Sequence, residues 1–141
     1  MLHMKLVKMF HVKQNISMIR QFTSKTQQLG EIGEDKAVVF LMKHGFKIIE
    51  RNFHSRNGEI DIIAKKARKY HFFEVKAGKQ RSWFNPADNL TKDKLWKLFR
   101  SVEYYCYTRN IKQYKIQGIV VLLASSSAEA MADTVEIIDL T

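Results

Sequence analysis

Apolar and polar positions follow two periods along this chain, and the changes of period predict its elements. Apolar residues at helical spacing predict helices over residues 26–44 and 91–108. Runs rich in β-branched and aromatic residues predict strands at 46–53, 59–64, 70–77, 116–124 and 134–140. The predicted order, α-β-β-β-α-β-β, indicates an α/β fold with a mixed central sheet of four to five strands flanked by helices.

Turn residues and changes of composition set the predicted boundaries. Gly45 marks the end of the first helix, residues 65–69 form the turn between the second and third strands, and residues 78–89 read as a loop. We expect one domain over residues 26–141, preceded by a basic extension at residues 1–25, because the first thirty residues contain no Asp or Glu. That extension fits a targeting segment, a flexible arm that grips phosphates, or a misassigned start with translation beginning at Met18.

The charge balance indicates the class of partner. Lys and Arg number 24 against 14 Asp and Glu, a formal net charge of +10, and a basic surface binds phosphates by releasing their counterions. Nucleic acid, most simply DNA, is therefore the expected partner, with solubility as the alternative explanation of the charge. No apolar run reaches the about 20 residues of a membrane span, so we expect no membrane association.

The cysteine content bears on the compartment. Cys106 is the only cysteine, which excludes an internal disulfide and suits the reducing cytoplasm. It lies among tyrosines without a neighbouring His, so a buried or half-buried helical thiol is expected rather than a nucleophile.

Three charged residues inside the most apolar strands carry the candidate chemistry. Side chains alternate along a strand, so Glu74 and Lys76 project from one side while Val75 turns into the core. If residues 59–64 and 70–77 pair as a hairpin, Asp61 and Glu74 can converge on one Mg²⁺ with Lys76 beside it. The alternative is a solvated sheet edge, which does not explain why the acids lie in such apolar strands.

Glu34 is a fourth candidate, three and four residues before Ala37 and Val38 on the apolar face of the first helix. One interpretation is an exposed acid in the first turn that favours the helix dipole. The other is a carboxylate directed at the metal site.

Several short motifs occur in order with characteristic spacing, and together they resemble the YraN family over residues 30–140. That family is regarded as related to restriction endonucleases and archaeal Holliday junction resolvases. The motifs that carry the resemblance are Gly30-Glu31-Ile32-Gly33-Glu34, Gly45-Phe46, Arg51-Asn52-Phe53, Gly58-Glu59-Ile60-Asp61-Ile62-Ile63-Ala64, Glu74-Val75-Lys76, Pro86 and Lys94.

The resemblance implies a restriction-endonuclease-like core and a PD-(D/E)XK metal site. Asp61, Glu74 and the Val75 carbonyl would hold Mg²⁺ or Mn²⁺, and Lys76 would orient a water or stabilise developing negative charge. Glu34 matches the helix-borne acid and would reach a second ion. The implied function is a metal-dependent endonuclease acting on DNA phosphodiester bonds, in particular in branched or structured DNA.

Contacts with nucleic acid are expected from four further residues. These are Lys79, Arg81, Trp83 and Lys94, where loop anchoring and a solvated first-turn lysine are the alternatives for Trp83 and Lys94. By the same resemblance a homodimer is expected, because symmetrical incision of a junction needs two sites. A nucleic-acid-binding module with little or no catalysis, or a partner protein in an RNA or DNA repair complex, is the alternative function.

Two positions depart from the family pattern. Gly78 stands where relatives carry an Arg soon after the Glu-Val-Lys triplet, although Lys79 and Arg81 lie nearby. Gln117-Gly118 stand where relatives tend to have an acid, and we expect that acid to lie outside the metal site.

Overall fold

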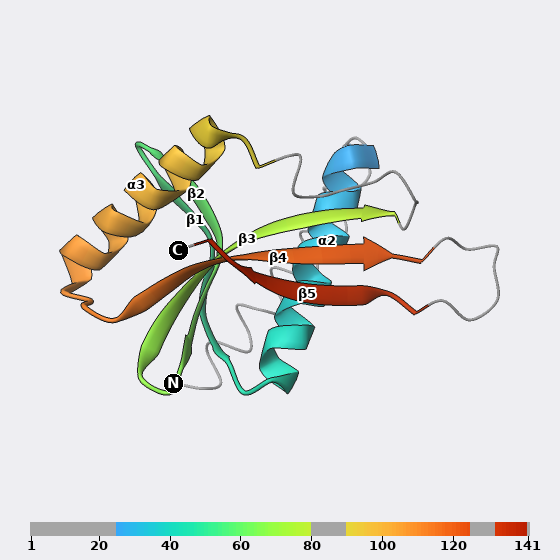
Figure 1. Ribbon diagram of the computed structural model, residues 1–141, viewed down its shortest axis with the longest axis horizontal. Coiled ribbons are helices and arrows are strands. Elements are labelled where there is room, and N and C mark those ends of the chain that lie inside the picture. The colour runs from blue at the N-terminus through green and yellow to red at the C-terminus, as the bar shows by residue number, and fades with distance from the viewer. Residues whose placement is uncertain (1–24, 80–89, 125–131, 141) are drawn as a thin grey trace, which may run out of the picture.

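Five strands form one sheet in the computed structural model, which describes residues 25–79, 90–124 and 132–140 (Figure 1). The α-β-β-β-α-β-β order predicted from the sequence is confirmed. Residues 1–24 of the predicted extension lie outside the described residues, as do Arg81, Trp83 and Pro86, while Lys25 begins the first helix. The elements are α2 (Lys25–Lys43), β1 (Lys47–Ser55), β2 (Gly58–Lys66), β3 (Lys69–Lys79), α3 (Lys92–Arg109), β4 (Tyr114–Leu123) and β5 (Thr134–Asp139).

The strands lie in the sheet in their order along the chain. β1, β2 and β3 form an antiparallel meander, β4 pairs parallel to β3, and β5 closes the other edge antiparallel to β4. A parallel neighbour requires a crossover, and α3 supplies it between β3 and β4. β3 runs to Lys79, further than predicted, because Gly78 and Lys79 pair with Leu122 and Leu123 of β4.

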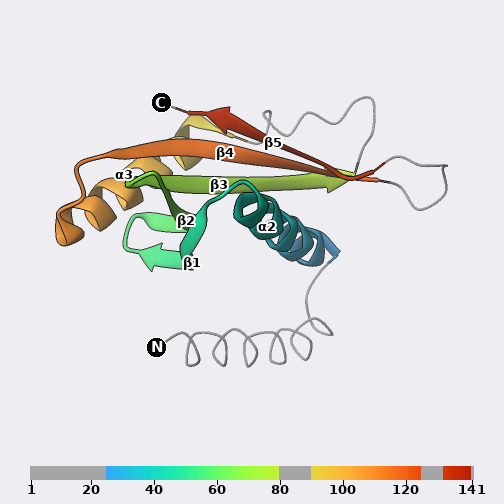
Figure 2. The same cartoon turned by 90° about the horizontal axis from the view of Figure 1, so that it is seen from below.

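Each helix covers one face of the sheet. Phe73, Val75 and Ile119 pack with Leu41 and other residues of α2, and Figure 2 shows α2 lying along that side of β3. Phe72 and its neighbours pack with α3 on the opposite face. Phe72 and Phe73 are both fully buried, and burial of a side chain of this size contributes about 1.5–3 kcal/mol.

The helix ends follow from local hydrogen bonds. Gly45 has a φ of 84°, and Phe46 N–H donates to the Leu41 carbonyl at 3.0 Å, which is the Schellman ending that a left-handed glycine allows. Thr91 caps α3 by accepting from Lys94 N–H at 3.3 Å. Neither described helix combines the length and the apolarity that crossing a bilayer demands.

The lone cysteine is buried in α3, as the sequence predicts. Burial raises the pKa of the Cys106 thiol to about 11, so the thiolate needed for nucleophilic attack is scarce at neutral pH.

Gly33 allows α2 to approach β3 closely. A Cβ built at Gly33 would overlap the Cβ of Ala77, a side chain that has no flexible end to move away. Gly30, one turn earlier in the same helix, has open space at the same position. The glycine at position 33 is therefore required by packing and not by backbone conformation.

Replacing Gly33 by Ala should destabilise the fold by about 1–3 kcal/mol, because the added methyl group forces α2 away from β3. Gly30→Ala is the matched control and should be neutral or stabilising by up to about 1 kcal/mol, since alanine favours a helix. Urea unfolding of the two variants measures the difference. Equal stability of the two would contradict the close approach of α2 to β3.

Candidate functional site

Asp61 lies where β2 and β3 part. The pairing of the two strands ends at Ile62 opposite Phe73. One residue further on, Asp61 Oδ2 accepts a hydrogen bond from Val75 N–H at 2.7 Å. The side chain of Asp61 thus replaces the backbone acceptor that β2 no longer provides, and only 7% of the residue is exposed.

The regular alternation of β2 side chains between the two faces of the sheet is interrupted at Asp61. Ile62 and Ala64 belong to the core on the α2 face, whereas Ile60 and Ile63 belong to the core on the α3 face. In an unbroken strand Ile60 and Ile62 would share a face. The irregularity turns the carboxylate of Asp61 towards β3 instead of into either core.

Asn52 of β1 shares this irregularity. It lies opposite Asp61, between the pairs Arg51 with Ile62 and Phe53 with Ile60, and its φ of 52° is in the left-handed region. Asn tolerates that conformation better than most residues, although it is still strained inside a strand. The site is therefore built on a deformed part of the sheet.

Glu74 and Lys76 project from the same side of β3, as predicted. Lys76 Nζ lies 3.2 Å from Glu74 Oε1, with the two side chains 23% and 18% exposed. Val75, between them, packs in the core on the α2 face. A partly desolvated ion pair thus stands beside the buried carboxyl of Asp61.

The electrostatics of the site oppose the ionisation of Asp61. Burial raises the pKa of Asp61 to about 8, and the negative charge of Glu74 adds to this, followed by smaller effects of Glu34 and Glu59. The hydrogen bond from Val75 N–H acts in the opposite direction. Neighbouring carboxylates that are partly shielded from water repel one another. A hard divalent cation bound between them would compensate their negative charge.

Glu34 projects from α2 towards β1, where it interacts with Arg51 and Asn52. It lies in the third turn of α2, which has no acid in its first turn, and its side chain is only 20% exposed, so the first-turn interpretation is wrong. Burial raises the pKa of Glu34, while the Arg51 guanidinium at 3.7 Å and a hydrogen bond with Asn52 lower it. Arg51 also bonds Asp35 at 2.9 Å.

Glu34 is not grouped with the two strand acids as ligands of one ion. In residues 25–79, 90–124 and 132–140, no three His, Cys, Asp or Glu side chains stand together as a metal-binding set. Asp61 and Glu74 therefore form a pair, and Glu34 influences them through its charge.

The predicted nucleic-acid contacts divide into two groups. Lys79 ends β3 and Lys94 lies in the first turn of α3, and both side chains are exposed. Arg81 and Trp83 fall between them, outside the described residues.

Gln117 has a partner set of its own. Its Oε1 accepts a hydrogen bond from His71 Nδ1–H at 2.7 Å, and its Nε2 donates to Asp139 Oδ1 at 2.8 Å. In the β3 and β4 register it stands beside Phe73, on the face opposite Glu74. Gly118, the other residue of this departure, pairs with Glu74 in the same register, so a side chain at position 118 would stand next to the carboxylate pair.

Arg51 and Asn52 are site residues that the sequence alone does not single out, although both belong to the motif Arg51-Asn52-Phe53. A signal was present, because an Asn within a predicted strand often marks a left-handed residue or a bulge. What the sequence did not show was that both side chains reach Glu34 across 17 to 18 positions of the chain.

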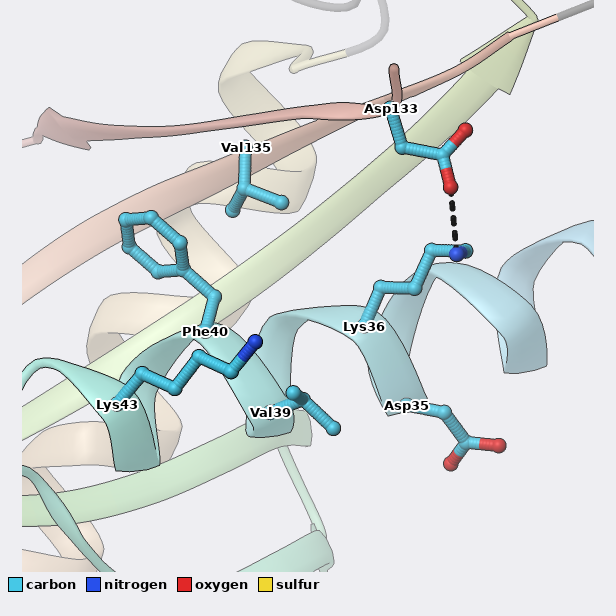
Figure 3. Close-up of a pocket in the computed structure, with 7 residues that line it drawn as sticks. All are labelled: Asp35, Lys36, Val39, Phe40, Lys43, Asp133 and Val135. Atoms are coloured by element: carbon cyan, nitrogen blue, oxygen red, sulfur yellow. Dashed lines mark ion pairs between the residues drawn. The ribbon is translucent and has the colours of Figure 1, made fainter.

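A hollow elsewhere on the surface does not belong to this site. It has a volume of about 370 Å³ between α2 and the start of β5, and Figure 3 shows Lys36 paired with Asp133 at its side. Neither Asp61 nor Glu74 lines it. Its lining residues are Asp35, Lys36, Val39, Phe40, Lys43, Asp133 and Val135.

Fold and site together define an α/β protein in which a buried Asp and a half-buried Glu lie on two central strands that separate at the Asp. The chain belongs to Uncharacterised protein family UPF0102, whose model matches residues 33–136, and this is the YraN family that its motifs resemble. It is similar to UPF0102 proteins of Helicobacter hepaticus, at 44% identity over 65% of this chain and 82% of the relative, and of Nitratiruptor, at 42% over 69% and 85%. A UPF0102 protein of Campylobacter jejuni is 49% identical over 54% of this chain and 66% of its own.

The raised pKa of Asp61 leads to a pH-dependent stability. An unfolded aspartate has a pKa of about 3.9, so between about pH 4 and the folded value of about 8 the folded protein keeps a proton that the unfolded chain has released. The free energy of unfolding should fall as pH rises through this window and level off above it. Asp61→Asn removes this fall, and its advantage over the parent should grow from pH 5 to pH 8, to about 1 kcal/mol or more.

Chemical denaturation at each pH measures the two profiles. Glu59→Gln is the control, because Glu59 is an exposed acid of the same strand whose nearest ionic partner is His54 at 3.4 Å. It should keep most of the parent's pH dependence. Parallel profiles for Asp61→Asn and the parent would show that Asp61 is ionised throughout.

The left-handed backbone at Asn52 gives a second prediction. Asn52→Ala should be less stable than Asn52→Gly by about 1 kcal/mol, since only glycine adopts this conformation without a Cβ penalty. Both variants lose the amide that bonds Glu34, so their difference isolates the backbone effect. At Asn57, which has no positive φ, the same two substitutions should not favour glycine; thermal unfolding of all four variants decides.

Proposed function

We propose that this chain is a metal-dependent endonuclease that acts on DNA phosphodiester bonds, with the PD-(D/E)XK arrangement of the restriction-endonuclease-like proteins. The observation that carries the proposal is the buried carboxyl of Asp61, with its pKa raised to about 8 by burial and by Glu74 where two central strands part. A protein that only needed stability would gain from an uncharged residue there.

The residues present fit Mg²⁺ or Mn²⁺. Asp61 and Glu74 offer the carboxylate oxygens that such hard cations prefer. Within a strand the N–H and C=O of one residue point to the same side, so the Val75 carbonyl faces the side on which Val75 N–H meets Asp61. When bound, the ion would supply Lewis acidity towards a phosphodiester oxygen and make an attacking water more acidic.

The chain's own groups orient and charge the site. Val75 N–H holds the Asp61 carboxylate in place. Lys76, whose side chain is 23% exposed and lies 3.2 Å from Glu74, can orient the nucleophile or stabilise negative charge that develops on the phosphate. Glu34 contributes negative charge next to this pair and is the residue proposed to reach a second ion.

The basic surface supports nucleic acid as the substrate. The net charge of +10 favours a polyanion, and the exposed Lys79 and Lys94 lie at the ends of β3 and α3 nearest the segment that joins them. Branched or structured DNA, a homodimer and a cytoplasmic setting are the finer parts of the proposal and come from the family resemblance and the single cysteine.

A binding module or a partner protein of the same fold is the second candidate. The observation in its favour is that no three His, Cys, Asp or Glu side chains of the described residues stand together as a metal-binding set, so a bound ion would also need ligands from the backbone, the solvent or the substrate.

Cleavage of labelled linear, flap and four-way DNA in Mg²⁺ and Mn²⁺ tests the proposal. Asp61→Asn and Glu74→Gln should each lose about 100-fold or more in rate, the scale of one removed electrostatic contact, and chelation should stop cleavage. Glu59→Gln, on the same strand but exposed, should retain activity.

Cleavage that survives in both strand variants would defeat the site assignment and indicate a contaminating nuclease. Binding of DNA without cleavage in either metal would favour the binding module. Retention on RNA columns in preference to DNA columns would favour the partner protein.

A further inference from the structure

The turn between β2 and β3 concentrates positive charge at one end of the sheet. Lys66, Arg68 and Lys69 lie within four positions, and the strand register adds Lys65 with Lys47 opposite it. We name these five residues the basic tip. It lies at the end of the β2 and β3 hairpin away from the parting of the strands at Asp61 (Figure 1).

The basic tip contains like charges in direct opposition. Lys47 pairs with Lys65 across β1 and β2, and Lys66 pairs with Lys69 across β2 and β3. Like charges directly opposite one another in a sheet are destabilising. The strand register, which is fixed by the buried residues, thus maintains a repulsion that a neutral residue at either position would remove.

The turn itself is also unfavourable. Ala67 and Arg68 have φ of 49° and 64°, the left-handed conformation of a two-residue hairpin turn in which Asn and Gly are preferred. An alanine and an arginine in these positions strain the backbone. Backbone preference therefore does not account for an arginine at position 68, which leaves its charge as the feature of interest.

No carboxylate of the described residues forms an ion pair with the basic tip. The Lys65 and Lys66 ammonium groups lie over the rings of Tyr70 and Phe46, at 5.1 and 4.9 Å from the centroids. Those contacts position the two side chains without neutralising them.

We propose that the basic tip is a second binding site for a nucleic-acid phosphodiester backbone, separate from the carboxylate pair. Lys65 is four positions after Asp61, and Glu74 is five positions after Lys69. At about 3.3 Å per position the tip therefore lies about 13–17 Å from the pair along the strands. The inference rests on the proposed function for the identity of the polyanion. It adds a second contact between the substrate and the domain, at the far end of the β2 and β3 hairpin from the carboxylate pair.

The chemistry of the turn favours nucleic acid over a lipid surface. Ala67 and Arg68 form the turn, so it offers no large apolar side chain to insert into a bilayer, which an interfacial site uses in addition to its charge. Adjacent cations that neutralise successive phosphates suit a continuous polyanion.

Binding of fluorescent four-way and linear duplex DNA, measured in chelator over a range of salt concentrations, tests the tip without cleavage. In the triple variant Lys66→Gln, Arg68→Gln, Lys69→Gln, affinity should fall at least about 10-fold. The slope of log K against log salt should become shallower by about 2 to 3, close to one per lost phosphate contact. Its thermal stability should equal or exceed that of the parent, because the repulsion is relieved.

A control with the same change in net charge is Lys36→Gln, Lys97→Gln, Arg100→Gln. Each of these cations already pairs with a carboxylate, namely Asp133, Asp93 and Glu103. The control should keep a slope within about 1 of the parent. An equal change in both triple variants, or none in either, would overturn the inference and leave only the effect of net charge.

The turn variant Ala67→Asn, Arg68→Gly separates structure from binding. It should raise thermal stability because it supplies the preferred turn residues, yet lower DNA affinity because it removes one cation. A gain in stability with unchanged affinity would show that Arg68 contacts no phosphate.

Failure of this inference can be told apart from failure of the proposed function. Loss of DNA binding on changing the tip, in a protein that never cleaves, supports the tip and defeats the nuclease. Cleavage that requires Asp61, with a rate and a substrate affinity that do not change when the basic tip is altered, supports the nuclease and defeats the tip. Tip-dependent binding to vesicles of phosphatidylserine and phosphatidylcholine, with DNA affinity unaffected, would overturn the choice of nucleic acid.

Discussion

The hydrogen bond from Val75 N–H to Asp61 Oδ2 connects the fold to the candidate site. It forms where β2 separates from β3, so it satisfies a backbone donor that would otherwise lose its partner in a buried place. The same bond holds a carboxylate beside Glu74, in a position where burial disfavours its charge. One contact thus ends a strand pairing and places an acid.

Several features around this contact reduce stability. Asn52 is left-handed opposite Asp61, the acids repel one another, and Arg51 is shared between Glu34 and Asp35. The two apolar clusters on either side of the sheet offset these effects, since Phe72, Phe73 and Ile62 are fully buried within them. Rigid packing on both faces of the sheet explains why the strained backbone and the like charges around Asp61 are tolerated between them.

The close approach of α2 contributes to the same arrangement. Gly33 brings the helix against Ala77 of β3, and the next residue, Glu34, consequently lies near enough to Arg51 and Asn52 to interact with both. A larger residue at position 33 would move Glu34 as well as loosen the core. Packing and electrostatics are therefore coupled through neighbouring residues of one helix.

Much of the fold could be predicted from local patterns. The seven elements, the endings at Gly45 and Thr91, and the common side of Glu74 and Lys76 follow from periodicity and capping, which act over a few residues. The sequence alone predicts a loop at Lys79, because nothing in residues 78–79 shows that pairing with β4 extends the strand. Arg51 and Asn52 received no role because their contact with Glu34 joins distant parts of the chain.

The amino-acid sequence by itself determined which residues could do chemistry and on which strands they lie, because side-chain type and strand periodicity are local properties. Only the tertiary structure decided that β2 leaves β3 at Asp61, that Asn52 is left-handed beside it, and that Lys47 faces Lys65. These outcomes depend on strand register and on the packing of α2 and α3, which are settled by many weak contacts between residues far apart in the chain.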